Sequence, residues 1–194
     1  MHSHSQRYDL CEIGQAFGLP GRYLEGAPYG SGHINDTFAV AYQQGADRVR
    51  YLHQRINEQV FKNVPALMSN IERVTRHVRA RLEAEGVRDA RAALTLIPAR
   101  DGRAWHRDAG GKYWRTYVFI EGARTYDVIE TPRQAYEAAR AFGRFQCLLA
   151  DLPPPRLHET IPDFHHTPRR FVAFEAAVAA DVKGRAAACR AEID

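Results

Sequence analysis

Cysteine is scarce in this sequence, and its placement argues against two kinds of framework. The three cysteines, Cys11, Cys147 and Cys189, are odd in number and far apart, and none belongs to a Cys-x-x-Cys pair. Disulfide scaffolds and zinc cages need paired or clustered thiols. We therefore expect reduced thiols, no structural metal and a cytoplasmic location.

Long apolar runs are lacking as well. No stretch approaches the roughly 18 apolar residues that cross a bilayer. The first residues include His2, His4 and Arg7 in place of the apolar segment of a secretory signal. We expect no membrane partner.

The sequence also lacks a block of like charge. Its 27 basic and 23 acidic residues give a net charge of +4 and are interleaved along the chain, so a nucleic-acid partner is not expected. Lys62, Lys112 and Lys183 are the lysines, and arginine supplies the rest of the positive charge. Arginine suits bidentate phosphate contacts, although an arginine excess also follows genome composition.

What is present indicates a folded α+β protein. The hydrophobic fraction of 45% is ordinary for a globular chain. Helical spacing over residues 8–19, which ends near Gly18, predicts a short first helix. Short β-type runs around glycine turns then predict three antiparallel strands, near Tyr23–Ala27, Thr37–Gln43 and Val49–Asn57.

A long helix follows this meander. Pro65 suits a first helical turn, Gly86 suits a stop, and apolar residues recur between them at helical spacing. Two further strands, near Ala93–Pro98 and Tyr113–Ile120, complete a predicted five-stranded antiparallel sheet. The pattern then changes to helices, over residues 133–150 and again around residues 171–182. We predict one domain over residues 1–121 and a second region over residues 122–194.

A glycine-rich bend enters the second predicted strand. Tyr29-Gly-Ser-Gly-His-Ile-Asn-Asp-Thr-Phe38 contains a Gly-x-Gly turn at Gly30 and Gly32. Glycine brings backbone N–H groups close to a phosphate because no Cβ stands in the way. The bend therefore predicts a nucleotide-binding loop.

The order of glycine loop, strand, long helix, two strands, hinge and helices resembles the nucleotide-binding N-lobe of the protein-kinase-like phosphotransferases. More narrowly, the sequence resembles the N-acetylhexosamine kinases, members of the aminoglycoside-phosphotransferase superfamily that phosphorylate the anomeric hydroxyl of a sugar. The matching stretches are Gly-His-Ile-Asn-Asp-Thr-Phe (32–38), Gln-Arg-Ile-Asn (54–57), Val-Phe-Lys-Asn (60–63), Ala-Leu-Met (66–68), Tyr-Glu-Ala-Ala-Arg-Ala-Phe-Gly-Arg-Phe-Gln (136–146) and Arg-Leu-His-Glu-Thr-Ile-Pro-Asp-Phe-His (156–165).

The resemblance implies transfer of the γ-phosphoryl group of ATP, with Mg²⁺, to a sugar hydroxyl, which depends on positioning and charge neutralisation. It assigns Gly30, Ser31 and Gly32 to the triphosphate, with the next residues shaping the loop and its entry to the strand: His33, Ile34, Asn35 and Thr37. Arg55 is expected to hold the place of the kinase lysine, and Glu72 the place of its helical partner.

A hinge is expected directly after the apolar strand. Glu121 and Gly122 fall where backbone groups would meet an adenine ring. Arg124, Tyr126 and Asp127 follow and are candidates for the sugar side of the cleft. They are equally compatible with an ordinary loop.

Three further patterns look catalytic or metal-binding and are rejected. The triplet of residues 106–108, His-Arg-Asp, lies in a hairpin before the hinge and lacks the asparagine that should follow it. Residues 163–165, Asp-Phe-His, have no catalytic loop before them. The histidines His158, His165 and His166 lack a metal-ligand spacing. No catalytic or metal-binding residue is therefore assigned within these 194 residues.

In such kinases the base and the metal ligands belong to a C-lobe, of which only the first helices are expected here. We therefore expect this N-terminal portion to be inactive alone, and its helices after residue 133 to expose apolar faces that favour self-association. Two alternatives stay open. The chain is a non-catalytic module that binds a nucleotide or a partner, or it belongs to a kinase of another acceptor, such as an aminoglycoside, choline or homoserine.

Overall fold

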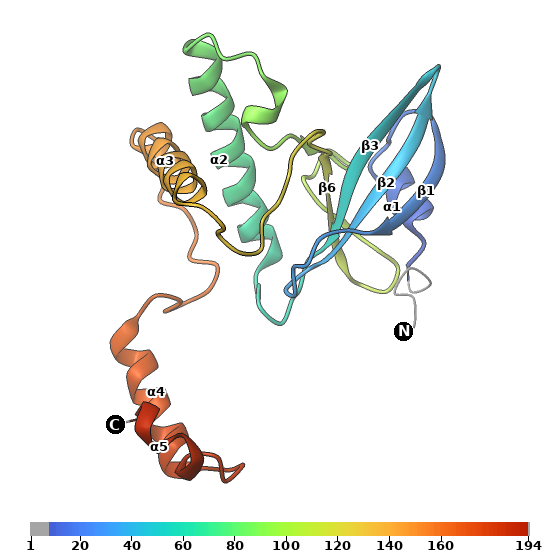
Figure 1. Ribbon diagram of the computed structural model, residues 1–194. Coiled ribbons are helices and arrows are strands. Elements are labelled where there is room, and N and C mark those ends of the chain that lie inside the picture. Colours follow the sequence, from blue (N-terminus) through green and yellow to red (C-terminus); the bar gives the residue numbers. More distant parts are fainter. Residues whose placement is uncertain (1–7, 194) are drawn as a thin grey trace. The chain divides into compact units, whose positions relative to one another are not determined.

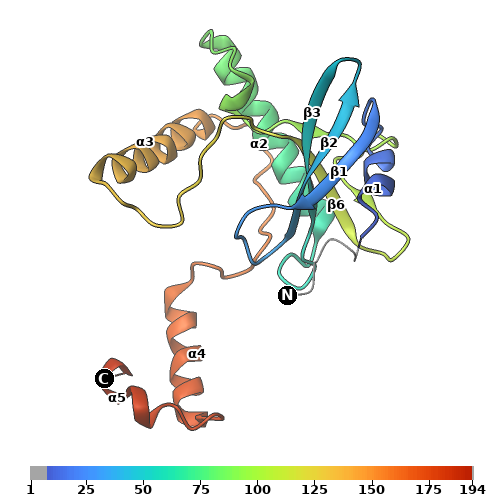
Figure 2. The ribbon, with the colours of Figure 1, turned by 45° about the vertical axis from the view of Figure 1, so that its right-hand side comes forward.

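A computed structural model describes residues 8–193 and shows a mixed α+β protein with an antiparallel sheet (Figures 1 and 2). The chain divides into two compact units, one up to Thr160 and one from Ile161 onward. We call them the N-terminal and the C-terminal unit. The functional boundary expected at residues 121/122 stays a prediction.

The sheet belongs to the N-terminal unit. Its strands are β1 (Arg22–Pro28), β2 (Asp36–Gln44), β3 (Asp47–Arg55), β4 (Leu96–Ile97), β5 (His106–Arg107) and β6 (Tyr113–Val118). Their order is β1-β2-β3-β6-β4, and β5 pairs with β6. The five predicted strands are therefore confirmed, and the two-residue β5 is an addition.

Strand β4 is shorter than the predicted run from Ala93 to Pro98. Arg79 of the long helix donates hydrogen bonds to the carbonyl oxygens of Ala93 and Leu94, at 3.4 and 3.5 Å. Arg79 also donates to the Thr95 hydroxyl, and the Thr95 carbonyl oxygen accepts from the N–H of Val118, so the residues before β4 contact both α2 and β6 although the paired residues begin at Leu96.

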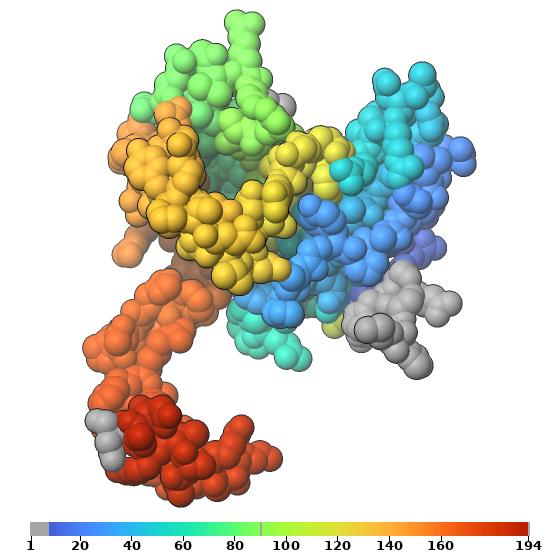
Figure 3. All heavy atoms as spheres, viewed as in Figure 1, coloured from blue at the N-terminus to red at the C-terminus, as the bar shows by residue number. Residues whose placement is uncertain are grey.

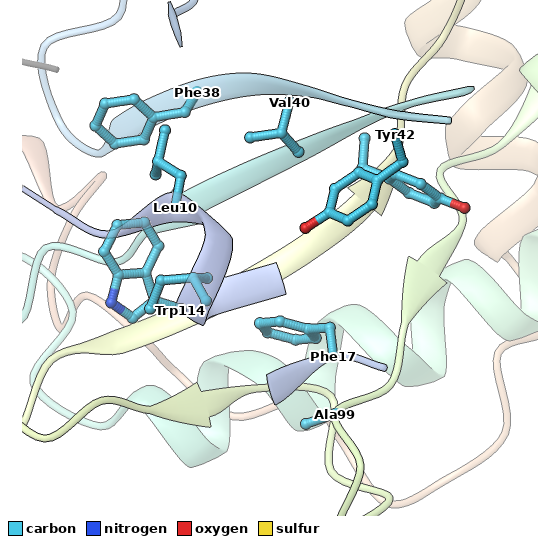
Figure 4. Packing of buried hydrophobic residues seen from close by; sticks show 9 residues of the cluster. Leu10, Phe17, Phe38, Val40, Tyr42, Ala99 and Trp114 are labelled. Atoms are coloured by element: carbon cyan, nitrogen blue, oxygen red, sulfur yellow. The ribbon is translucent and has the colours of Figure 1, made fainter. Parts of the chain in front are cut away.

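Helix α1 (Leu10–Ala16) closes one face of the sheet. The carboxylate of Asp9 caps it by accepting a hydrogen bond from the backbone N–H of Glu12 at 2.9 Å. Leu10 of this helix joins Phe38, Val40 and Trp114 in one buried cluster (Figure 4). Phe17, just after the helix, belongs to the same cluster and stacks on His53 of β3 at 6.2 Å between ring centroids. The predicted first helix is confirmed.

Helix α2 (Val64–Ala84) lies on the other side of the sheet (Figures 1 and 2). Asn63 caps its first turn, Pro65 stands in that turn as predicted, and Gly86 follows its end at a φ of +77°. Its first half packs in a cluster with Ile56 and Ala104.

Helix α3 (Pro132–Leu149) begins with a capping box. The Thr131 hydroxyl accepts from the N–H of Gln134, and the Gln134 side chain accepts from the N–H of Thr131. Its end packs on the second half of α2, where Leu148 joins Val78 and Leu82. Arg144 and Glu85 add an ion pair at 2.6 Å.

The segment after α3, which we call the strap (residues 150–158), is fixed to α2. Asp151 accepts hydrogen bonds from His77 and Arg81, each at 3.0 Å. Asn70 donates to the carbonyl oxygen of His158 at 2.8 Å and accepts from its N–H at 2.9 Å. Arg73 donates to two proline carbonyl groups of the strap.

The C-terminal unit contains α4 (Thr167–Ala180), a 3-10 turn (Ala187–Cys189) and α5 (Arg190–Ile193). His166 caps α4 by accepting from the N–H of Arg169 at 3.2 Å. Within the described part of the chain, no helix combines the length and apolar character required to cross a bilayer.

Candidate functional site

The two faces of the sheet differ in burial. Side chains alternate between faces along a strand, and cross-strand partners share a face. One face, which we call the closed face, is buried under α1 and includes Val40, His53, Trp114 and Thr116, none more than 1% exposed. The opposite face, the open face, is only half-buried along the middle of β2 and β3. The open face is therefore the less covered side of these two strands.

The glycine loop lies at one edge of this open face. It spans Tyr29 to Asn35 between β1 and β2. Gly30 adopts a φ of +83°, which a side chain would strain, and a Cβ added there would meet nothing within 4 Å. The loop is fixed at its base, where the Asn35 side chain accepts from the N–H of Asn57 at 2.9 Å.

The glycine loop also contacts the segment after β6. The Ser31 hydroxyl donates to the Asp127 carboxylate at 2.9 Å, and the rings of Tyr29 and Phe119 meet edge to face at 5.1 Å. Figure 3 shows the loop (blue) beside the segment that follows β6 (yellow) on the molecular surface. Two predicted regions, 96 residues apart in the sequence, thus come together.

The predicted hinge is fixed by a charged pair. Arg50 of β3 forms a bidentate ion pair with Glu121 and stacks on Phe119 at 3.8 Å from the ring centroid. The hydrogen bond from the Arg50 guanidinium holds the pKa of Glu121 below its usual value. Gly122 follows at a φ of +70°. The Glu121 side chain is therefore bonded to Arg50 of the sheet, and the backbone changes direction at Gly122.

A polar row crosses the open face from the base of the glycine loop to α2. Thr37, Gln54 and Arg115 stand opposite one another on β2, β3 and β6. The Gln54 amide donates to the Thr37 hydroxyl at 2.8 Å, and its oxygen accepts from Arg115 Nε at 2.8 Å. Arg115 also lies 3.8 Å from the sulfur of Met68 on α2.

Arg55 and Glu72 are not brought together in the structure. Arg55 follows Gln54 on β3 and therefore belongs to the closed face, where it forms an ion pair with Asp36 at 2.6 Å and lies over the Tyr8 ring. It lines a polar pocket of about 640 Å³ there, with Asp108 and Lys112. Glu72 is half-buried on α2, the helix on the side of the sheet opposite to α1. The expected Arg55–Glu72 pair is therefore wrong.

The other predicted site residues are surface residues. His33 and Ile34 are exposed in the glycine loop, and Gly32 has nothing within 4 Å of an added Cβ. Arg124 lies over the Tyr126 ring at 4.8 Å from its centroid, and Tyr126 is half-exposed. Arg124 and Tyr126 directly precede Asp127, which contacts the glycine loop through Ser31.

The floor of the open face was not predicted from the sequence. Ala27 and Ala39 stand opposite each other on β1 and β2, and Ala39 stands opposite Leu52 of β3. The side chains of this part of the face are therefore small or aliphatic. The sequence does contain this information, because every second residue of β2 and β3 faces the same side of the sheet.

An apolar cavity of about 510 Å³ lies farther along, between α2 and the sheet. Its wall includes Ile71, Val74, Tyr117 and Phe145, with Arg115 at one side. The cavity lies between α2 and the β6 part of the open face. Arg115, the last residue of the polar row, contacts α2 at Met68.

The rejected patterns have structural roles. The Asp108 carboxylate accepts from the Trp114 indole N–H at 2.7 Å and from the N–H of Lys112 at 2.8 Å. Asp163 forms an ion pair with Arg169 of α4. In the described residues, no group of three or more His, Cys, Asp or Glu side chains is arranged to hold a metal ion.

A scan of the sequence against protein-family models finds no matching family.

Proposed function

We propose that this chain forms the nucleotide-binding part of a protein-kinase-like phosphotransferase. The observation that carries the proposal is the glycine loop, which contacts the segment after β6 through Ser31–Asp127 and Tyr29–Phe119 beside a half-buried sheet face. A glycine loop, whose backbone can approach a ligand closely, next to small and aliphatic side chains suits a nucleotide, because it offers separate places for phosphates and base.

The base would lie on the open face. Its floor would consist of Ala27, Ala39 and Leu52, with Phe119 at the side and the backbone near Glu121 as hydrogen-bonding edge. The phosphates would lie under Gly30, Ser31 and Gly32. Mg²⁺ would accompany the triphosphate, and none of the described residues is assigned to it.

We further propose that the acceptor is an N-acetylhexosamine phosphorylated at its anomeric hydroxyl. This part rests on the sequence stretches that resemble the N-acetylhexosamine kinases. Arg124, Tyr126 and Asp127 are the proposed acceptor-side residues, and their position beside the glycine loop is compatible with a transfer site near the terminal phosphate.

Nucleotide binding tests the first proposal. Isothermal titration of the chain with ATP and Mg²⁺ should show saturable binding, and Ala39→Trp should weaken it at least tenfold because the indole would fill the floor. Ala80→Trp, at an exposed position of α2, is the matched control and should bind ATP like the unchanged protein. Equal ATP affinity in all three proteins would contradict the site.

An acceptor panel tests the second proposal. ADP release is measured with N-acetylglucosamine, N-acetylgalactosamine, choline, homoserine and an aminoglycoside. Release that depends only on the N-acetylhexosamines supports the assignment, and dependence on another acceptor replaces it. Nucleotide binding without ADP release with any acceptor leaves the nucleotide site standing and argues for a non-catalytic module.

The second candidate is a non-catalytic module that associates with a partner or with itself. Exposed apolar side chains on α3 favour it, because Tyr136 is 62% and Phe142 73% exposed. Light scattering separates this candidate: concentration-dependent association supports it, whereas a monodisperse monomer argues against it.

A further inference from the structure

The charge balance of the open face singles out Arg115. By strand register, the arginines on this face are Arg22, Arg48, Arg50, Arg107 and Arg115, and of these Arg22 and Arg107 are exposed. Arg48 pairs with Glu25, and Arg50 pairs with Glu121. Arg115 has no carboxylate partner in the part of the chain that the structure describes. It hydrogen-bonds the neutral side chains of Gln54 and Met68 and lies over the Tyr117 ring at 5.4 Å from its centroid.

Burial makes this missing partner significant. The Arg115 side chain lies between β6 and α2 and is half-buried. A guanidinium group removed from water without an anion is held at a cost that an incoming anion offsets. Burial accordingly lowers the pKa of Arg115 from its usual value, although the group stays charged at neutral pH.

The geometry directs this charge toward the glycine loop. The Nε and one terminal nitrogen of Arg115 both donate to the Gln54 oxygen, so the guanidinium is drawn across β6 toward β3. Gln54 in turn bonds Thr37, the residue that pairs with Tyr29 at the base of the loop. Arg115 stands on β6, two strands from β2, and neighbouring strands lie about 4.8 Å apart, so its Cα lies about 10 Å from that of Thr37, and the hydrogen bonds to Gln54 draw the guanidinium over part of that distance.

We propose that Arg115, oriented by Gln54, is the side chain that binds the phosphates of the nucleotide. Arg55 has no such role, because its charge is compensated by Asp36 on the closed face. This inference rests on the proposed nucleotide site and specifies which residue neutralises the ligand. Planar guanidinium groups suit this role because they bind phosphate oxygens with two parallel hydrogen bonds.

The test compares ATP with adenosine, since only ATP carries the phosphates. Titrations at fixed ionic strength are made on the unchanged chain and on Arg115→Met, Arg115→Lys and Arg55→Met. Arg115→Met should lose about 10-fold to 100-fold in ATP affinity, the range of a charge-assisted hydrogen bond, and bind adenosine as before. Arg115→Lys should fall between the two, and Arg55→Met should change neither affinity.

Gln54→Glu gives a second test that keeps the local shape. The new carboxylate still accepts both hydrogen bonds from Arg115 but compensates its charge, so ATP affinity should fall about as far as in Arg115→Met, with no loss in melting temperature. A residue with a merely structural role would not produce this pattern. The variant also covers the case in which Arg115→Met does not fold.

The outcomes separate this inference from the nucleotide site itself. Unchanged ATP affinity in folded Arg115→Met and Gln54→Glu overturns the inference while nucleotide binding stands. A loss confined to Arg55→Met transfers the role to Arg55. Absence of both ATP and adenosine binding by the unchanged chain overturns the nucleotide site and the inference together.

Discussion

The closed and open faces of the sheet share the same strands but differ in what their side chains do. On the closed face, aromatic and aliphatic residues such as Phe38, Val40 and Trp114 pack against α1. On the open face, small or polar residues such as Ala39, Gln54 and Arg115 remain half-buried. Along β2 and β3, apolar burial is therefore concentrated on the closed face, and substitutions on the two faces should differ in their effect on stability.

Truncation of the closed-face tryptophan should have the largest effect. Trp114 is fully buried, and Trp114→Ala should lower the free energy of unfolding by about 3–5 kcal/mol because it leaves a cavity. Leu52→Ala, on the half-buried open face, is the matched control and should cost about 1 kcal/mol. Urea unfolding followed by circular dichroism measures both. Equal losses would remove the distinction between the faces.

Acid should destabilise the closed face through His53. Burial lowers the pKa of His53 to about 4, whereas an exposed histidine titrates near 6.5. The unfolded chain therefore binds the proton first, and stability present above about pH 6.5 is lost as the pH falls toward 4. The loss reaches about 3 kcal/mol.

The His53 contribution is measured as a difference between two proteins. Unfolding free energies of the unchanged chain and of His53→Gln are compared between pH 7.5 and 4.5. The histidine-dependent part of the slope should disappear in the variant. His53 Nδ1 bonds the Thr116 hydroxyl at 2.8 Å, and Nε2 has no hydrogen-bond partner among the described residues, so nothing nearby compensates a second proton. Parallel pH profiles for the two proteins would refute the assignment.

Removal of an open-face ion pair should have the smallest effect. Arg48 and Glu25 are both more than half exposed, and exposed pairs contribute about 0–1 kcal/mol. Arg48→Ala should therefore change the melting temperature very little, and the small change should vanish in high salt. A loss comparable with that of Trp114→Ala would mean that the open face also supports the fold.

Much of the architecture could be predicted because its signals are local. The 3.6-residue period between Pro65 and Gly86 is an intrinsic property of α2, and glycine turns divide the meander into strands. Strand β5 was missed because two residues carry no period. The extent of β4 was missed because no local pattern in residues 93–98 marks where the pairing with β6 begins.

The site was predicted only in part. The glycine loop and the hinge follow from sequence order, but the face of each β3 residue depends on register. The two-residue turn at Gly45 and Ala46 sets Gln44 opposite Asp47 and hence Thr37 opposite Gln54. This register places Gln54 on the open face and Arg55 on the other. Arg55 was selected from the sequence because it is the basic residue of the third predicted strand. Arg115 belongs to a distant strand, and no local sequence pattern indicates that it contacts Gln54.

The strap attached to α2 implies an uneven tolerance to sequence change. Asn70 and Arg73 hold it through main-chain groups of residues 153, 155 and 158, so the bonded atoms are the same whatever side chains those positions carry. The side chains of these three positions can therefore change while these bonds persist, whereas Asp151 is held through its own carboxylate. Variation should accumulate at residues 156–158, and Asn70 and Arg73 should be the positions where exchange detaches it.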